Sequence, residues 1–183
     1  FRIEVLPEDA DPMDVRYNLI QWIHRSTRGW SYGASIVDPR TGEIIKGQVS
    51  LGSLRVRQDY MILSGLVDNP NDIQNKSLIK KTSLDRIRQL SAHEIGHTLG
   101  FAHNYISSAN NRSSVMDYPH PKIDLVDGKI SIADAYSENI GDWDKVSVEY
   151  AYRDFPNTKN ENNELDKIIN EAQKNSLYFL SDS

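Results

Sequence analysis

Eleven residues in the middle of the chain, His93-Glu94-Ile95-Gly96-His97-Thr98-Leu99-Gly100-Phe101-Ala102-His103, contain three of its five histidines. Their pattern and that of the preceding residues predict a helix over residues 77–100. A helix turns by about 100° per residue, so His93 and His97 share one face and lie about 6 Å apart along the axis. Both imidazoles can therefore reach one zinc ion at the usual Zn–N distance of about 2.0–2.1 Å.

Three further positions in this stretch complete the prediction of a metal site. Glu94 lies about 60° from His97 around the helix, where it can border a metal without ligating it, as a general base must. Gly100 can adopt a positive φ and end the helix, so that the chain turns and brings His103 back to the metal. Three imidazoles and one water form the open arrangement of a catalytic zinc. The alternative, ordinary histidines on an amphipathic helix, requires this spacing to arise by chance.

The composition excludes several classes of protein. The 183 residues are 38% hydrophobic and 26% charged, which indicates one globular domain. No apolar run approaches the roughly 20 residues that span a bilayer. The net charge of −5 argues against a nucleic-acid-binding surface. The absence of cysteine is compatible with a reducing or an oxidising compartment.

Strands are expected in the first half of the chain. Alternation of apolar and polar residues predicts a strand over residues 1–6. Residues 15–24 suit either a helix face or a strand, and their β-branched and aromatic content favours a strand buried on both faces. Short strands over residues 34–37 and 43–51 flank a Pro- and Gly-containing turn and predict a hairpin.

Helices are expected after these strands. One is predicted over residues 53–66, and the stretch 68–72 separates it from the helix over 77–100. The compact body is predicted to end near residue 155. Residues 156–183 are expected to form a polar linker and a short helix with four apolar residues at helical spacing, which are Leu165, Ile168, Ile169 and Ala172. This tail either packs back on the body or leads towards a further domain.

The motif over residues 93–103 matches the metzincin zinc-protease signature. Ser114-Val115-Met116-Asp117-Tyr118 resembles the Met-turn of that clan, and residues 22–33, 38–44 and 141–145 resemble a bacterial branch, the exported Met-zincin metalloproteases. The resemblance extends from residue 1 to about residue 152. It implies an α+β (α/β-like), zincin-like fold, in which a mixed twisted sheet with an antiparallel edge hairpin packs on the active-site helix, followed by a Met-turn and C-terminal helices.

The resemblance also implies an activity. The chain would be a zinc-dependent endopeptidase in which His93, His97 and His103 bind one zinc ion and Glu94 acts as the general base. Two alternatives stay open. The chain could be a catalytically inactive zinc-containing module that binds a protein or a glycan in its cleft, or a hydrolase of a non-peptide bond.

Further roles come with the resemblance. Met116 would form an apolar floor beneath the zinc, although an ordinary core position is the alternative. Tyr118 would contact the metal or donate a hydrogen bond to a developing oxyanion, although packing alone is also open. Gly100 would have a structural role at the site, as the residue at which the chain turns, and Asp117 is expected to form a turn. Residues 118–134 would form the S1′ pocket.

The expected partner is an extended polypeptide substrate, paired along the edge strand of the hairpin over residues 34–51, although a plain sheet hairpin is also open. Of the other histidines, His24 is expected to be structural and His120 to lie exposed near the cleft. Calcium binding is possible for one acidic loop, but a solvated loop is the stronger expectation. The residues of this loop are Glu8, Asp9, Asp11 and Asp14.

The chain also departs from the metzincin pattern, which opens with a strand and a long helix before the segment assigned to residues 1–6. We therefore expect residues 1–155 to be a catalytic domain without its first elements, within a longer chain that has flanking domains. An exported location, outside the cytoplasm, is expected from the family resemblance.

Overall fold

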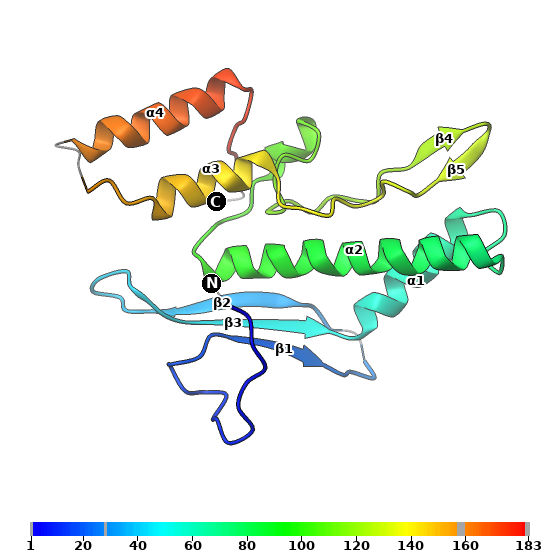
Figure 1. Ribbon diagram of the computed structural model, residues 1–183, viewed down its shortest axis with the longest axis horizontal. Helices are drawn as coiled ribbons and strands as arrows, with labels where there is room; N and C mark the ends of the chain where they lie inside the picture. The colour runs from blue at the N-terminus through cyan, green and yellow to red at the C-terminus, as the bar shows by residue number, and fades with distance from the viewer. Residues whose placement is uncertain (1, 28, 157–159, 182–183) are drawn as a thin grey trace.

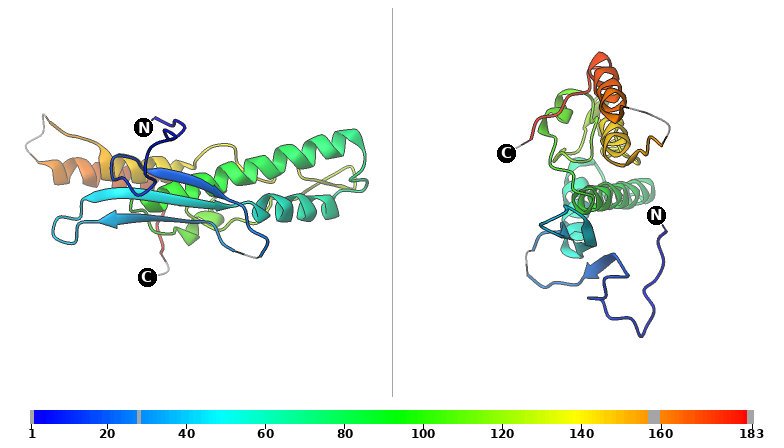
Figure 2. Two further views of the ribbon diagram at one scale, coloured as in Figure 1. Left: turned by 90° about the horizontal axis from the view of Figure 1, so that it is seen from below. Right: turned by 90° about the vertical axis from the view of Figure 1, so that its left-hand side faces the viewer.

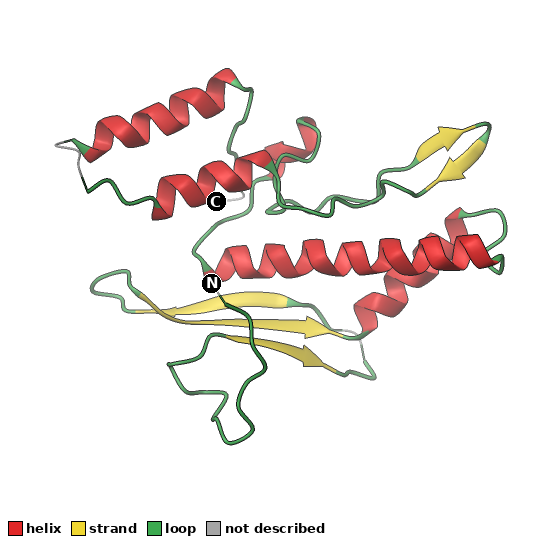
Figure 3. Ribbon diagram, in the orientation of Figure 1, coloured by secondary structure: helices red, strands yellow, loops and turns green. Residues whose placement is uncertain are grey.

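The long helix α2 (Ile73–Thr98) is the central layer of the structure, which is a computed structural model that describes residues 2–27, 29–156 and 160–181. A small sheet lies on one side of α2. The chain that follows α2, with helices α3 (Asp142–Tyr152) and α4 (Glu161–Lys174), lies on the other side (Figure 1; Figure 2, right). The three-stranded sheet lies on one side of α2 and helices α3 and α4 lie on the other (Figure 3), and the α+β class that the sequence predicted is confirmed.

The sheet has three strands in the order β1-β3-β2. Strand β1 (Leu19–Ile23) pairs parallel with β3 (Ile44–Gly52), whereas β2 (Tyr32–Val37) pairs antiparallel with it. The sheet is therefore mixed, and its antiparallel edge hairpin is formed by β2 and β3, as predicted. Strand β2 lies at one edge and packs, together with β3, against α2.

Two expectations for the first half of the chain are wrong. Residues 2–6 form no strand, and the side chains of Ile3 and Val5 are 83% and 95% exposed, while residue 1 lies outside the described residues. Alternation gives a strand only where a neighbouring strand can accept its hydrogen bonds, and the described part of the chain provides none here. Strand β1 lies within the predicted range 15–24, but its alternating burial shows that one face is more exposed, so it is not buried on both faces.

The helices start close to the predicted positions, with one informative difference. Helix α1 (Leu54–Leu66) agrees with the prediction, whereas α2 begins four residues earlier than expected. Asp72 is the reason, because its carboxylate accepts hydrogen bonds from the main-chain N–H groups of Gln74 and Asn75, at 2.9 and 3.3 Å. The acidic stretch that separates the two helices therefore also caps the second one.

Two apolar clusters hold α2 in place. The first joins its N-terminal half to α1 and to the returning chain, and it consists of Leu63, Ile79, Ile132, Ala135 and Tyr136. The second joins its C-terminal half to β3, through Val49, Leu51, Leu90 and Ile95. The returning chain also forms a hairpin of β4 (Asp124–Val126) and β5 (Lys129–Ser131), which was not predicted.

The end of the chain packs back on the body. The predicted short helix is present as α4, which packs against α3, and the Trp143 and Phe179 rings stack with centroids 5.9 Å apart. Part of the predicted linker, residues 157–159, lies outside the described residues. Within the described ranges, none of the helices combines the length and the apolar character that crossing a bilayer requires.

Candidate metal centre

The C-terminus of α2 reverses the chain at Gly100. This residue has a φ of +88°, in the left-handed region that glycine tolerates best. The N–H of Gly100 donates to the carbonyl of His97 at 3.0 Å, and the N–H of Phe101 donates to that of Gly96 at 3.1 Å. This pair of bonds is a Schellman motif, which ends a helix and turns the chain. The turn predicted at Gly100 is confirmed, and it carries His103 back towards α2.

The three histidines of the motif converge. The Nε2 atom of His97 lies 3.1 Å from Nε2 of His93 and 3.2 Å from Nε2 of His103. A tetrahedral ion with metal–nitrogen bonds of roughly 2.0–2.1 Å holds two ligand nitrogens about 3.3 Å apart. The spacing of the three nitrogens therefore fits a single metal ion, and among the described residues this trio is the group able to hold one.

The other ring nitrogen of each histidine contacts an oxygen atom. His93 Nδ1 lies 2.7 Å from the carbonyl of Val115, and His97 Nδ1 lies 2.9 Å from that of Phe101. A carbonyl can only accept, so Nδ1 carries the proton in both rings and the Nε2 lone pairs face each other. Burial keeps His93 neutral by lowering its pKa to about 4. Facing lone pairs of neutral rings repel, so this donor set suits a cation placed between them.

Glu94 lies beside this trio and is almost completely buried. Burial raises the pKa of its carboxyl, while a hydrogen bond donated by the main-chain N–H of Gly33 acts in the opposite direction. Strand β2 approaches α2 so closely at this point that a Cβ on Gly33 would lie 1.9 Å from the Glu94 carbonyl oxygen. The sequence reasoning missed Gly33, because nothing local marks a contact between residues 61 positions apart.

Met116 packs against α2 at Gly96, about 200° around the helix from Glu94, the residue that β2 approaches. Its side chain is buried, and a Cβ on Gly96 would lie 2.3 Å from its sulfur atom. Gly96 was not singled out from the sequence, although a glycine within a helix costs stability and so indicates a close packing contact. The apolar-floor role of Met116 stays a prediction.

Tyr118 reaches the site from the end of the same segment. Its hydroxyl lies 2.7 Å from Nε2 of His103, although its ring is 58% exposed. Asp117 accepts a hydrogen bond from the Tyr118 N–H at 2.7 Å and further bonds from the Ser107 and Ser108 hydroxyls. Asp117 therefore orders the turn, as expected, and does not face the trio.

A buried carboxylate that the sequence did not reveal supports this segment. Asp144, at the start of α3, accepts hydrogen bonds from the Ser114 hydroxyl at 2.5 Å and from the Val115 N–H at 2.8 Å. The Ser114 hydroxyl in turn accepts from the N–H of Met116 at 2.9 Å. The peptide group that joins Val115 to Met116 is therefore fixed at both of its polar atoms. Its carbonyl oxygen accepts a hydrogen bond from His93, and its N–H donates to the Ser114 hydroxyl, which in turn donates to Asp144. Burial raises the pKa of Asp144.

The remaining predicted residues lie away from the trio or contribute no metal ligand. His24 and His120 are both exposed. In the acidic loop, Asp14 pairs with Arg16 at 2.6 Å, and this contact lowers its pKa to about 2.

The segment predicted to form the S1′ pocket extends far beyond the trio. Residues 124–131 form the β4–β5 hairpin, beside the N-terminal half of α2 (Figure 1). A cavity of about 640 Å³ is lined by Met116, by residues 99–102 after the end of α2, and by residues of α3, of α4 and of the C-terminal tail. The S1′ pocket stays a prediction.

Comparisons with known proteins agree with this geometry. Residues 75–183, more than half of the chain, match the Met-zincin family. Searches among curated proteins and among solved structures give no match. The matched part begins at the start of α2 and includes the histidine trio, Met116 and Tyr118. This chain belongs to the Met-zincin family and contains its metzincin-like zinc metalloprotease domain.

Proposed function

We propose that this chain is a zinc-dependent endopeptidase. The observation that carries the proposal is the convergence of three Nε2 atoms at 3.1–3.2 Å with a buried carboxylate, Glu94, beside them. His93, His97 and His103 would hold the ion. When bound, zinc supplies Lewis acidity, which polarises a carbonyl and lowers the pKa of water towards about 7.

Glu94 would move the proton in this reaction. Its carboxylate takes a proton from the attacking water and later delivers it to the amine that leaves when the peptide bond breaks. Its burial raises its pKa, which brings its affinity for the proton closer to what a general base needs at neutral pH. The N–H of Gly33 orients the carboxylate and favours its ionised state.

Tyr118 would assist at the oxygen of the scissile carbonyl. Its hydroxyl already lies at hydrogen-bond distance from His103, and the exposure of its ring leaves room for a substrate to approach. In this role the hydroxyl donates a hydrogen bond to the negative charge that develops on that oxygen. Packing alone is the competing role for this side chain.

The proposed substrate is an extended polypeptide. Strand β2 lies at the edge of the sheet and contacts Glu94 through Gly33, so a peptide paired along this edge would pass close to the general base. Unpaired main-chain groups of an edge strand favour such strand addition. An exported location stays a prediction that rests on family resemblance.

The decisive test is the variant Glu94→Gln. It should retain zinc, measured as bound metal after gel filtration, and lose about 100- to 10,000-fold of the cleavage rate of a denatured protein, because the general base is gone. His97→Ala is the contrasting variant and should lose the metal as well. A zinc-loaded Glu94→Gln protein that still cleaves at the wild-type rate would refute the general-base role.

A second candidate is a zinc-containing module that binds protein or glycan without cleaving it. The observation that favours it is the 2.7 Å contact between the Tyr118 hydroxyl and His103 Nε2, because a phenol so close to the trio could occupy the fourth position of a closed site. Tyr118→Phe separates the two. Activity that appears only in this variant would support the closed module, whereas cleavage by the wild-type chain, blocked by a chelator, would support the protease.

A further inference from the structure

Asn104, the residue that follows His103, is completely buried although its side chain is polar. Its main-chain N–H donates to the carbonyl of Met116 at 2.7 Å, which ties the segment after α2 to the segment beneath the trio. The side chain itself points to a different part of the chain, the C-terminal tail at residues 177–181.

Both polar atoms of the Asn104 side chain bind the main chain of this tail. Nδ2 donates to the carbonyl of Tyr178 at 2.9 Å, and Oδ1 accepts from the N–H of Leu180 at 2.9 Å. The neighbouring residue adds a third bond, from the N–H of Tyr105 to the carbonyl of Leu180 at 3.0 Å. The amide thus bonds the tail as a neighbouring strand would. The side chains of Tyr178, Phe179 and Leu180 are about half exposed, so these main-chain bonds add to what side-chain packing contributes to holding the tail.

The same two residues position His103. Asn104 is bonded to it covalently, and the Tyr105 hydroxyl lies 3.2 Å from His103 Nδ1. Release of the tail would leave the buried amide of Asn104 without partners, which is costly, so the local chain would have to rearrange. Rearrangement at Asn104 and Tyr105 would move the third ring of the trio.

We infer that Asn104 is a positioning residue, which clamps the C-terminal tail and thereby fixes His103 for metal binding. The inference rests on the proposed zinc site but not on catalysis. It assigns residues 178–180 to the metal centre, although they are 75 or more positions from His103. Groups that orient metal ligands change metal affinity by about 10- to 100-fold when they are removed, and we expect an effect of this size.

The test measures zinc affinity by competition with a chromophoric chelator, using the full chain. Asn104→Ala removes both side-chain bonds, and Leu180→Pro removes the donor from the tail while Asn104 stays intact. Each variant should weaken zinc binding by about 10- to 100-fold. Asn110→Ala is the matched control. It removes another bond to the tail, from Asn110 Nδ2 to the Ser176 carbonyl at 2.7 Å, which lies further along the chain from the ligand. It should change the affinity less than about twofold.

The double variant and a spectroscopic signature separate positioning from a general loss of stability. If one contact is responsible, Asn104→Ala and Leu180→Pro together should cost little more than either alone. The ligand-field bands of the cobalt-substituted protein should shift in both variants and stay unchanged in Asn110→Ala. Should Asn104→Ala fail to fold, Leu180→Pro alone decides the question.

Three outcomes are distinguishable. Folded variants that bind zinc as tightly as the wild type overturn the clamp and leave the proposed protease intact. A wild-type chain that binds zinc but cleaves no peptide overturns the protease, while the affinities of the variants still decide the clamp. A wild-type chain that binds no zinc overturns both.

Discussion

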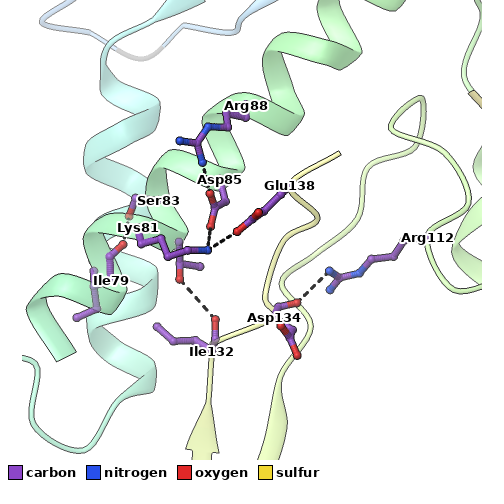
Figure 4. A network of polar contacts seen from close by, with 10 residues as sticks. Ile79, Lys81, Ser83, Asp85, Arg88, Arg112, Ile132, Asp134 and Glu138 are labelled. Carbon is purple, nitrogen blue, oxygen red and sulfur yellow. Dashed lines mark hydrogen bonds and ion pairs between the residues drawn. The ribbon is translucent and has the colours of Figure 1, made fainter. Parts of the chain in front are cut away.

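The two halves of helix α2 contact the same returning chain by different means. In the N-terminal half, Lys81 donates to Glu138 of the returning chain at 2.6 Å and to Asp85 of its own helix at 2.9 Å, and Arg88, one turn further along α2, also pairs with Asp85 (Figure 4). The side chains of Lys81, Arg88 and Glu138 are all more than half exposed. The Lys81–Glu138 pair is exposed and contributes about 0–1 kcal/mol, and Lys81 and Arg88 reach the buried Asp85 from solvent, so the apolar cluster around Ile79 provides most of the stability there.

In the C-terminal half, the contacts are buried, and most of those that fix the site are polar. His93 binds the carbonyl of Val115, Asp144 holds the segment that contains Val115, and Met116 packs against Gly96. Here a displacement of a fraction of an ångström would break a bond that fixes a ring nitrogen. One helix is therefore tolerant of substitution where it only supports the fold and intolerant where it positions ligands.

The largest expected effect that separates the two halves comes from a pair of buried carboxylates. Asp144→Ala leaves the N–H groups of Val115 and Gly141 and the Ser114 hydroxyl without their acceptor, so it should lower the free energy of unfolding by about 3–5 kcal/mol. Among the described residues, Asp85→Ala frees the side chains of Lys81 and Arg88, which solvent can hydrate, and it should cost about 1 kcal/mol or less.

Urea denaturation of the metal-free proteins measures both values. Equal losses of stability in the two variants would contradict the difference between the halves, because they would mean that the exposed cations on α2 contribute as much as the buried acceptor of α3.

The next effect is a dependence of stability on pH that belongs to the C-terminal half. Burial lowers the pKa of His93 from 6.5 to about 4 in the folded, metal-free protein. The folded state thus resists protonation, so the stability that this residue contributes is complete above pH 6.5 and is lost as the pH falls towards 4. The loss should be on the order of 3 kcal/mol.

The measurement compares unfolding of the metal-free wild type with that of His93→Gln between pH 7.5 and 4. The free energy of unfolding of the wild type minus that of His93→Gln should decrease as the pH falls. His120→Gln, which changes a histidine at an exposed position, serves as the control. A difference that stays constant over this range would mean that the ring of His93 is not buried in its neutral form.

How well the sequence predicted these regions follows from the range of the interactions. The trio, Glu94 and the turn at Gly100 lie within eleven residues, so helix geometry and one glycine are enough to bring them together. Gly33 and Asp144 come from elements far away in the chain, and no local periodicity indicates where a strand edge or a later helix will pack.

The errors at the first elements have a related cause. Alternation over residues 1–6 describes what a strand would need, but the partner strand is a tertiary feature that the pattern does not contain. Asp72 was read as part of a break between helices, and its capping of α2 depends on where the helix actually starts. The Asn104 clamp was equally inaccessible, because its partners lie 74 and 76 positions further along, near the C-terminal end of the described chain.

The smallest expected effect compares two glycines within helices. Replacement by alanine should favour the helix by about 0.5–1 kcal/mol at both positions. A Cβ at Gly65 of α1 meets nothing within 4 Å, so Gly65→Ala should stabilise the protein by this amount. A Cβ at Gly96 meets the sulfur of the buried Met116, so Gly96→Ala should instead destabilise the protein by about 1–3 kcal/mol.

Thermal denaturation of the two variants decides this comparison, and Met116→Ala in the Gly96→Ala background sharpens it. Loss of the larger side chain removes the overlap, so the cost of the added methyl group should disappear in that background. If Gly96→Ala were as stabilising as Gly65→Ala, Met116 would have room to move away from α2. The C-terminal half of the helix would then be as tolerant of substitution as the N-terminal half, and close packing of Met116 could not be what holds the metal-binding face in place.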